Sequence, residues 1–472
     1  MRLRTFSITL LTLALGACAV GPDYKTPSTS AGALGKFVSD EEGTAIASAA
    51  LPDQWWRLYH DATLDRLIAD ALSANTDVRT AVARLEQSRS VLWESTAERL
   101  PTTNLDARVE RQRLSSINTL PGEDRNVTYT DAGFNVSYEL DLFGRVRRNV
   151  EAARGDVDAA QADLDAARVS VVADTTRAYV DAASAAQRLA VGQHIVDLLQ
   201  QSLKLTERRE EAGFATRLDI VRIDTLLQQR RAELPTITAQ RQAALFRLAV
   251  LLGRTPRELP VEASAITMPP TLSSPIPAGD GRALLARRPD VRAAERRLAG
   301  ATARIGVATA DLYPRISLGA SIGSASYNGF DNFFGAGPLQ WLAGPLISWS
   351  FPNQAKIRAR IAGAKADANA ALAQFDGSVL RALSETETAL SSYSRSLDNH
   401  AALKAARDQA ERAVKIVRGR QREGQVDSLS LLDAERTFAE AEAQLADADG
   451  RIAGAQVDVF KALGGGWETA PS

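Results

Sequence analysis

Few residues of this chain have the side chains that catalysis or metal binding requires. The only histidines and the only cysteine are His60, His194, His400 and Cys18. They lie far apart, the histidines fall in segments of helical character, and no phosphate-binding glycine motif accompanies a strand pattern. Acidic pairs such as Asp163 and Asp165, or Glu440 and Glu442, are predicted to be solvated faces of helices. The sequence therefore predicts no catalytic residues, no metal site and no dissociable cofactor.

One segment near the C-terminus places charged and apolar side chains together at helical spacing. Leu429, Asp433 and Arg436 are four and three residues apart, so they share one face of a helix. Arg222 stands at the position equivalent to Asp433 in an earlier, similar segment, so a base replaces the acid there. The plainest interpretation is an ordinary ion pair three residues apart on an amphipathic helix, worth about 0.2–0.5 kcal/mol. The spacing alone therefore does not assign a function to this face of the helix.

Very long helices must position this segment. The runs 145–211 and 355–423 contain no proline, and at ~1.5 Å per residue each would be on the order of 100 Å long. Each ends at a glycine, Gly213 or Gly424, which tolerates the positive φ of a helix C-terminus, and another helix returns beyond it. Helices of this length cannot bury a stripe within one globular domain, so they are predicted to associate laterally.

Alternating apolar and polar residues precede each long helix and predict two β-hairpins. In the first, Leu105 and Val109 alternate with Asp106 and Arg108, and the second repeats the pattern from Ile316 to Phe351. Strands that are apolar on one face and polar on the other are typical of membrane β-barrels. Four strands are too few to enclose a lumen, and hydrocarbon does not tolerate open sheet edges. Several chains are therefore expected to pool their strands.

The N-terminus has the pattern of a secretory signal. Two arginines precede an apolar run that is too short to span a membrane, and small residues follow it up to Cys18. The ending Leu-Gly-Ala-Cys resembles the lipobox of bacterial lipoproteins, which implies acylation of Cys18 and removal of residues 1–17. Ala19 follows in place of the aspartate that often retains such proteins in the inner membrane, so the outer membrane is expected. A lone buried thiol is the alternative.

Composition and internal repetition agree with a folded protein made of two halves. The 472 residues include 56 Lys and Arg against 57 Asp and Glu, a balance that points to no nucleic-acid partner. Pro101 and Pro314 stand 213 residues apart, and Gly213 and Gly424 stand 211 residues apart, each pair in a similar setting. A proline-rich stretch separates the halves. Markers repeated in order predict two structural repeats.

Several motifs, taken together, resemble the outer-membrane factor (TolC-like) family, in its lipoprotein branch that serves tripartite efflux pumps. The resemblance spans the mature chain, and it rests on Cys18, Trp55-Trp56, Tyr138 to Arg145 (YELDLFGR), Arg287 to Val291 (RRPDV), Leu429 to Arg436 (LSLLDAER) and Lys461 to Trp467 (KALGGGW).

The resemblance implies an α+β membrane protein that forms a homotrimer in the cell outer membrane. Its 12-stranded β-barrel, with four strands from each chain, would continue into a long α-helical periplasmic barrel. The duct would pass small molecules from periplasm to exterior, together with a periplasmic adaptor protein and an inner-membrane RND transporter. Leu429, Asp433 and Arg436 would form an aperture gate, and the turns at Gly213 and Gly424 would contact the adaptor.

On this basis the chain divides into six segments. They are a signal peptide (1–17), a lipidated tether with an equatorial segment (18–60), repeat 1 (61–253, hairpin 102–140), a linker (254–281), repeat 2 (282–464, hairpin 315–351) and a C-terminal tail (465–472). Two alternatives stay open: the exit duct of a type I protein-secretion system, and a lipid-anchored periplasmic coiled-coil scaffold without a pore.

Overall fold

The computed structural model describes residues 19–39, 46–47, 49, 51–272, 274–327, 329–331, 333–352 and 354–467. Cys18 lies outside these residues. The chain divides into two compact units. The first takes in Met1–Pro27, Arg84–Gln161 and Ala293–Asp376, and the second takes in Ser28–Ala83, Ala162–Arg292 and Gly377–Ser472.

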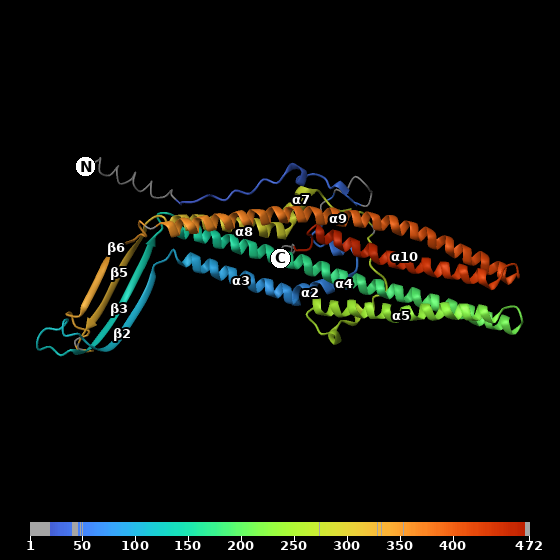
Figure 1. Cartoon of the computed structure of the whole chain (residues 1–472), viewed down its shortest axis with the longest axis horizontal. Coiled ribbons are helices and arrows are strands. Elements are labelled where there is room, and N and C mark those ends of the chain that lie inside the picture. Colours follow the sequence, from blue (N-terminus) through green and yellow to red (C-terminus); the bar gives the residue numbers. More distant parts are fainter. Residues whose placement is uncertain are drawn as a thin grey trace. The chain divides into compact units, whose positions relative to one another are not determined.

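The first unit contains a four-stranded antiparallel sheet in the order β2-β3-β5-β6 (Figure 1). Its strands are β2 (Thr102–Arg113), β3 (Asn126–Leu140), β5 (Arg315–Ser326) and β6 (Leu339–Ser348). Each hairpin pairs with itself, and β3 pairs with β5, so the two hairpins form one continuous sheet. β2 and β6 are its edges, and neither has a second partner among the described residues.

The strand register gathers apolar side chains on one face of the sheet. Leu105 is paired with Phe134, Phe134 with Ile322, and Ile322 with Trp341, so one apolar row crosses all four strands. This face is bare in the single chain, because Leu105 is 72 % and Trp341 74 % exposed. An apolar surface of this kind marks a contact with lipid or protein.

The fourth strand differs from its prediction in two ways. It spans Leu339–Ser348, whereas the alternation predicted it from Ile347 to Phe351 after a Gly-rich loop, so the two overlap only at Ile347 and Ser348. Pro345 lies within the observed strand, which is tolerated because β6 is an edge strand. Its opposite face is also not uniformly polar, because Leu342 is paired with Ser321 and Leu346 with Ser317. Both leucines are exposed at this edge of the sheet.

Helices complete the first unit. They are the greater part of α3 (Thr76–Ala97) and of α8 (Pro289–Ala310) and the beginnings of α4 (Arg145–Glu211) and α9 (Ala355–Arg422). Ala301 and Ile305 of α8 pack on Ala368 of α9. Small side chains at this contact let the two helices approach closely.

The second unit holds the rest of α4 and α9 with two returning helices, α5 (Arg217–Leu251) and α10 (Ser428–Ala462). It also contains the short elements η1 (Ala31–Leu34), β1 (Ile46–Ala47), η3 (Trp55–Tyr59), α2 (Ala62–Ala74), η4 (Pro256–Glu258), α6 (Val261–Ser264), β4 (Ile276–Pro277) and α7 (Gly281–Arg287). β1 and β4 form a small parallel pair.

An aromatic cluster forms a core in the second unit. The Trp55 side chain is completely buried and stacks on Phe460, with ring centroids 4.4 Å apart. Trp56 and Tyr59 meet Trp55 edge to face. The Trp55 indole donates a hydrogen bond to the carbonyl oxygen of Gly465 at 3.3 Å. Two of the motifs that carry the family resemblance, Trp55-Trp56 and the glycine run after Leu463, are therefore parts of one packed core.

α4 and α9 are uninterrupted helices of 67 and 68 residues, close to the runs that the sequence predicts. Among the described residues, no helix has an apolar stretch of the length and hydropathy that a membrane span requires.

Candidate functional site

Both turns between long helices have the same hydrogen-bond geometry. At the α4–α5 turn Gly213 has φ +78°, and the Phe214 N–H donates to the Arg209 carbonyl at 2.7 Å. At the α9–α10 turn Gly424 has φ +72°, and the Gln425 N–H donates to the Arg420 carbonyl at 2.9 Å. This six-to-one bond is the Schellman motif, which needs a left-handed residue and so favours glycine. The two glycines thus shape two equivalent, exposed helix ends.

The first turns of α10 separate the LSLLDAER motif into an exposed face and a buried face. Leu429, Asp433 and Arg436 are all exposed, as their spacing predicts, with Leu429 46 % accessible. On the opposite side, Leu431 is buried and Leu432 packs against the core formed by α4 and α5. The structure therefore brings the three predicted residues together on one uncovered face.

The ion pairs of this face differ from the simplest expectation. The Arg436 Nε lies 3.5 Å from a Glu440 carboxylate oxygen, one helical turn further on, and no pair with Asp433 forms among the described residues. Glu440 also lies 3.6 Å from Arg230 of α5. Both arginines thus share one acid. Asp433 keeps its carboxylate free of any protein donor within the described part of the chain.

Glu435, in the middle of the same motif, is a buried anchor that the sequence analysis missed. Its side chain is 8 % exposed and accepts hydrogen bonds from the Ser202 hydroxyl of α4 at 2.8 and 2.9 Å. Arg418 of α9 donates to it at 2.9 Å. Its burial could have been predicted from spacing, because Glu435 follows the buried Leu431 by one helical turn. Its partners Ser202 and Arg418 are 233 and 17 residues away in the sequence, so no local pattern could predict them.

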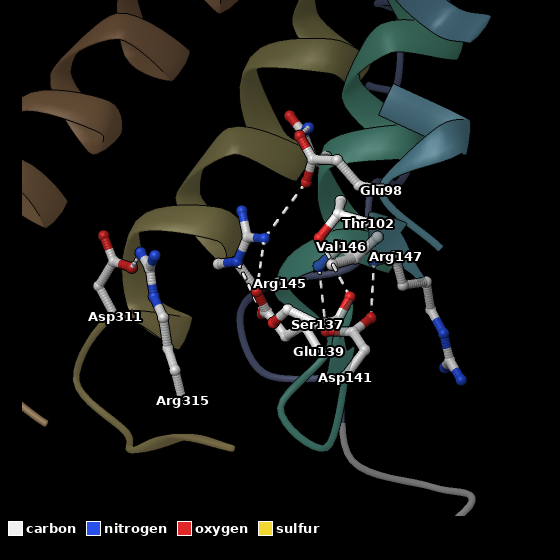
Figure 2. A network of polar contacts seen from close by, with 11 residues as sticks. Glu98, Thr102, Ser137, Glu139, Asp141, Arg145, Val146, Arg147, Asp311 and Arg315 are labelled. Carbon is white, nitrogen blue, oxygen red and sulfur yellow. Dashed lines mark hydrogen bonds and ion pairs between the residues drawn. The ribbon is translucent and has the colours of Figure 1, made fainter. Parts of the chain in front are cut away.

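A polar network joins the sheet to the start of α4, and the YELDLFGR motif contributes Glu139, Asp141 and Arg145 to it (Figure 2). The Asp141 carboxylate accepts from the backbone N–H groups of Val146 at 3.0 Å and Arg147 at 2.8 Å. A carboxylate at this position satisfies free helix N–H groups and interacts favourably with the helix dipole. Arg145 pairs with Glu139 at 2.9 Å and with Glu98 at 3.2 Å. The motif therefore fixes the strand-to-helix turn.

The segment that follows Cys18 is bound at the same turn. The Val20 N–H donates to the Phe143 carbonyl at 3.1 Å, and Arg148 pairs with Asp23 at 2.6 Å. The Tyr24 hydroxyl donates to Glu295 at 2.8 Å. Burial of the hydroxyl is the larger cause and this hydrogen bond the next, and they raise the pKa of Tyr24 to about 12. The beginning of the described chain is therefore held beside the end of the sheet.

The RRPDV motif forms an ion network around the buried Arg288 in the second unit. The Arg288 side chain is 9 % exposed and pairs with Asp290 and Glu385, each at 2.7 Å. It also donates to the Ala462 carbonyl at 2.9 Å. Burial opposes the ionisation of Asp290, but the hydrogen bond and charge of Arg288 outweigh it and hold the pKa of Asp290 below its usual value. This motif stabilises the fold and presents no reactive group.

Three sequence-based assignments of polar residues need correction. His60 is not helical, since it follows η3 with φ +52°, whereas His194 and His400 lie in α4 and α9. Asp165 is buried and pairs with Arg292 at 2.7 Å, and one Glu442 carboxylate oxygen is buried. Neither acid lies on a solvated face, because neighbouring helices cover both. Within the described ranges, no group of three or more His, Cys, Asp or Glu residues could hold a metal ion.

Comparison with known proteins agrees with these motifs. Residues 67–254 and 281–465 match the family model described as outer membrane efflux protein. The chain is 31 % identical to the outer membrane protein OprJ of Pseudomonas aeruginosa, over 100 % of this chain and 98 % of that protein. It is 30 % identical to the toluene efflux pump outer membrane protein TtgI of Pseudomonas putida, over 97 % of each.

Solved structures share the fold. The outer-membrane channel OprN superimposes with a TM-score of 0.87 at 36 % identity, covering 95 % of this chain and 100 % of that chain. The open state of the MtrE outer membrane channel of Neisseria gonorrhoeae gives 0.83 at 29 % identity, covering 96 % and 99 %. The family match extends over most of the residues whose geometry is described above. The chain therefore belongs to the outer membrane efflux protein family.

Proposed function

We propose that this protein is the outer-membrane exit duct of a tripartite efflux pump and works as a homotrimer. The observation that carries the proposal is the open four-stranded sheet with its bare apolar face, in a chain of this family. Relatives are named as components of pumps for toluene and as an outer membrane protein for pyoverdine export, which favours small molecules as cargo. The inferred partners are a periplasmic adaptor and an inner-membrane RND transporter.

The open edges of the sheet support its closure by further copies of the chain. The outer edges of β2 and β6 carry backbone N–H and C=O groups without strand partners in the described chain. In hydrocarbon each unsatisfied group costs several kcal/mol, so only a closed sheet is stable there. Pairing β2 of one copy with β6 of the next closes both edges, and three copies give a barrel of 12 strands. The apolar row through Leu105 and Trp341 would then face lipid.

This assembly can be tested by mass and by conductance. Light scattering of detergent-extracted protein should give the mass of three protomers, and the trimers should form discrete conductance steps in planar bilayers. A monodisperse monomer that retains its β-signal by circular dichroism would contradict the trimer. Folded trimers that never conduct, even with the tip substitutions described below, would contradict the duct.

Lipidation of Cys18 is a further part of the proposal. Support comes from the position of Val20, which is hydrogen-bonded to Phe143 where the sheet ends. An acyl chain attached two residues earlier would enter the membrane at the level where the barrel leaves it. Multiple acyl chains anchor firmly, because each buried methylene adds about 0.8 kcal/mol. Mass spectrometry of the N-terminal peptide should find an acylated Cys18, and an unmodified thiol in membrane-derived protein would contradict this assignment.

We also propose that Leu429, Asp433 and Arg436 line the aperture at the helix ends. All three are exposed in the single chain, and no donor to the Asp433 carboxylate lies within the described ranges, so Asp433 is available to neighbouring copies around a three-fold axis. Like charges brought together in this way need cations near them. The turns at Gly213 and Gly424 would be the surface that the adaptor contacts.

Single-channel recording tests the gate. Replacing Asp433 and Arg436 together with Ala should loosen the closed state and raise the conductance, with trimer mass and β-content unchanged. Leu429→Ala should widen the aperture in the same direction. The matched control is Arg395→Ala, which removes an exposed arginine paired with Asp398 elsewhere on the long helices. Unchanged conductance in both folded gate variants would refute the gate while leaving the duct intact.

A further inference from the structure

We propose that a groove between α4, α5 and α10 binds a small organic anion that carries phosphate groups or paired carboxylates. The inference goes beyond the proposed duct, because it concerns a site within one chain. The groove has a volume of about 590 Å³ and lies in the second unit. This is the size of pockets that hold small molecules, which range from about 300 to 1,000 Å³.

The helical repeat brings the lining residues together. Arg177, Asp181, Ser184 and Arg188 are spaced four, three and four residues apart, so they project from one face of α4. The polar residues from the other two helices are Gln240 and Arg247 of α5 and Asp447 and Arg451 of α10. Side chains from three separate helices thus converge on one space.

The groove has more positive than negative charge. Its lining has four arginines and only two aspartates. Arg188 pairs with Asp447 at 3.1 Å, and Arg247 pairs with Asp181 at 3.3 Å.

The other two arginines leave donors to spare. Arg177 is held by Asp458 through a single terminal nitrogen, at 2.7 Å to each carboxylate oxygen. Among the described residues, Arg451 has only a neutral partner, the Asn399 amide oxygen at 3.1 Å. A guanidinium has five N–H donors, so each arginine keeps donors for a further acceptor.

A buried hydroxyl adds a second, independent indication of a ligand. Ser184 is 8 % exposed, and its Oγ has no hydrogen-bond partner among the described residues. Buried hydroxyls are normally satisfied, so an unpaired one calls for an additional acceptor or donor. Gly450 of α10 packs directly against this side chain, since a Cβ atom on Gly450 would come within 2.9 Å of the Ser184 Cβ and Oγ. The glycine therefore lets α10 approach the hydroxyl closely at this end of the groove.

The chemistry of the lining selects the class of ligand. A planar guanidinium binds phosphate or carboxylate with two parallel N–H···O bonds, and these bonds are stronger when water is partly excluded. The groove of about 590 Å³ presents arginines from three helices, so a ligand with two or more anionic groups can use more of them than a single small ion. Pyrophosphate and citrate are the simplest probes of the phosphate and carboxylate forms.

Calorimetric titration of the full-length protein in detergent tests the site. Pyrophosphate, citrate or both should bind saturably with one site per chain. Arg177→Gln and Arg451→Gln should each weaken binding by about tenfold or more, because each removes a charge-assisted contact that the spare donors would make. The matched control is Arg89→Gln, which removes an exposed arginine paired with Glu86 outside the groove and should leave binding unchanged.

A substitution that keeps the size of the side chain tests the site without removing any arginine that the fold uses. Gln240 is exposed and accepts a hydrogen bond from Arg188 at 2.5 Å. Gln240→Glu would place a competing carboxylate beside that arginine and should also weaken binding about tenfold. Binding of neither probe to wild-type protein, or equal binding by the control and all three groove variants, would overturn the proposal. Neither result bears on trimer mass or conductance.

Discussion

Trp55→Ala should destabilise the protein strongly, because Trp55 is the centre of the aromatic core of the second unit. The side chain is fully buried, stacks on Phe460 at 4.4 Å and donates to the Gly465 carbonyl. A buried aromatic ring removes about 150–250 Å² from water, which at ~25 cal/mol per Å² corresponds to roughly 4–6 kcal/mol. Measured Trp→Ala losses in cores are about 3–5 kcal/mol, so we expect about 4 kcal/mol.

Trp55→Phe is the graded comparison. It keeps a stacking ring but loses the indole hydrogen bond, worth about 1 kcal/mol, and part of the ring volume, so a loss of about 2 kcal/mol is expected. Val261→Ala, at a position 80 % exposed, should change stability by less than about 0.5 kcal/mol.

Thermal unfolding followed by helical circular dichroism measures these effects. With an unfolding entropy of about 2.1 cal/mol/K per residue, a chain of 472 residues gives about 1 °C per kcal/mol. Trp55→Ala should therefore lower the Tm by about 4 °C and Trp55→Phe by about 2 °C. A Tm for Trp55→Ala within experimental error of the Val261→Ala control would refute the assignment of the Trp55-Trp56 motif to the core. Trimers of Trp55→Phe that fold should conduct as the wild type does, since the residue does not line the aperture.

Three other predictions concern the sheet-to-helix turn, the ion network around Arg288 and the helix ends. Arg145→Ala, which removes the pair with Glu139, should cost about 1–3 kcal/mol by thermal unfolding, and no loss would contradict the role given to the turn. Asp290→Asn should be less stable than wild type at neutral pH. Because Arg288 lowers the folded-state pKa of Asp290, the difference should persist down to about pH 3.9 and shrink below it. A difference that vanishes by pH 5 would refute this pairing. Gly424→Ala should cost about 1 kcal/mol through backbone strain alone, since no atom lies within 4 Å of the added Cβ. An unchanged Tm would contradict a left-handed residue at this turn.

Periodic patterns predicted the long elements of this fold well. α4 begins at Arg145 and ends at Glu211, as the proline-free run and the following glycine predict. The strand alternation predicted that Leu105 and Val109 share one face of the sheet. Both lie in β2, and both are exposed in the single chain. These elements depend on residues close together in the sequence, so a single sequence contains their signal.

Contacts between distant segments could not be predicted in the same way. The spacing along α10 did not single out Glu435, which is buried and bound by Ser202 and Arg418. Asp165 was placed on a solvated face, but Arg292 lies 127 residues away in sequence and pairs with it. β6 likewise begins at Leu339 and not near Ile347, because residues 339–346 pair with β5 across the sheet. Side-chain partners across helices are set by tertiary packing, which the spacing of residues along one helix does not specify.

The structure of the assembled protein in lipid nanodiscs, determined by electron cryomicroscopy, tests the central claim most directly. A trimeric duct predicts a three-fold particle in which β2 of each copy is hydrogen-bonded to β6 of the next, with Leu105 and Trp341 facing the lipid. A monomer with an open four-stranded sheet, or a sheet that lies outside the lipid, would contradict it.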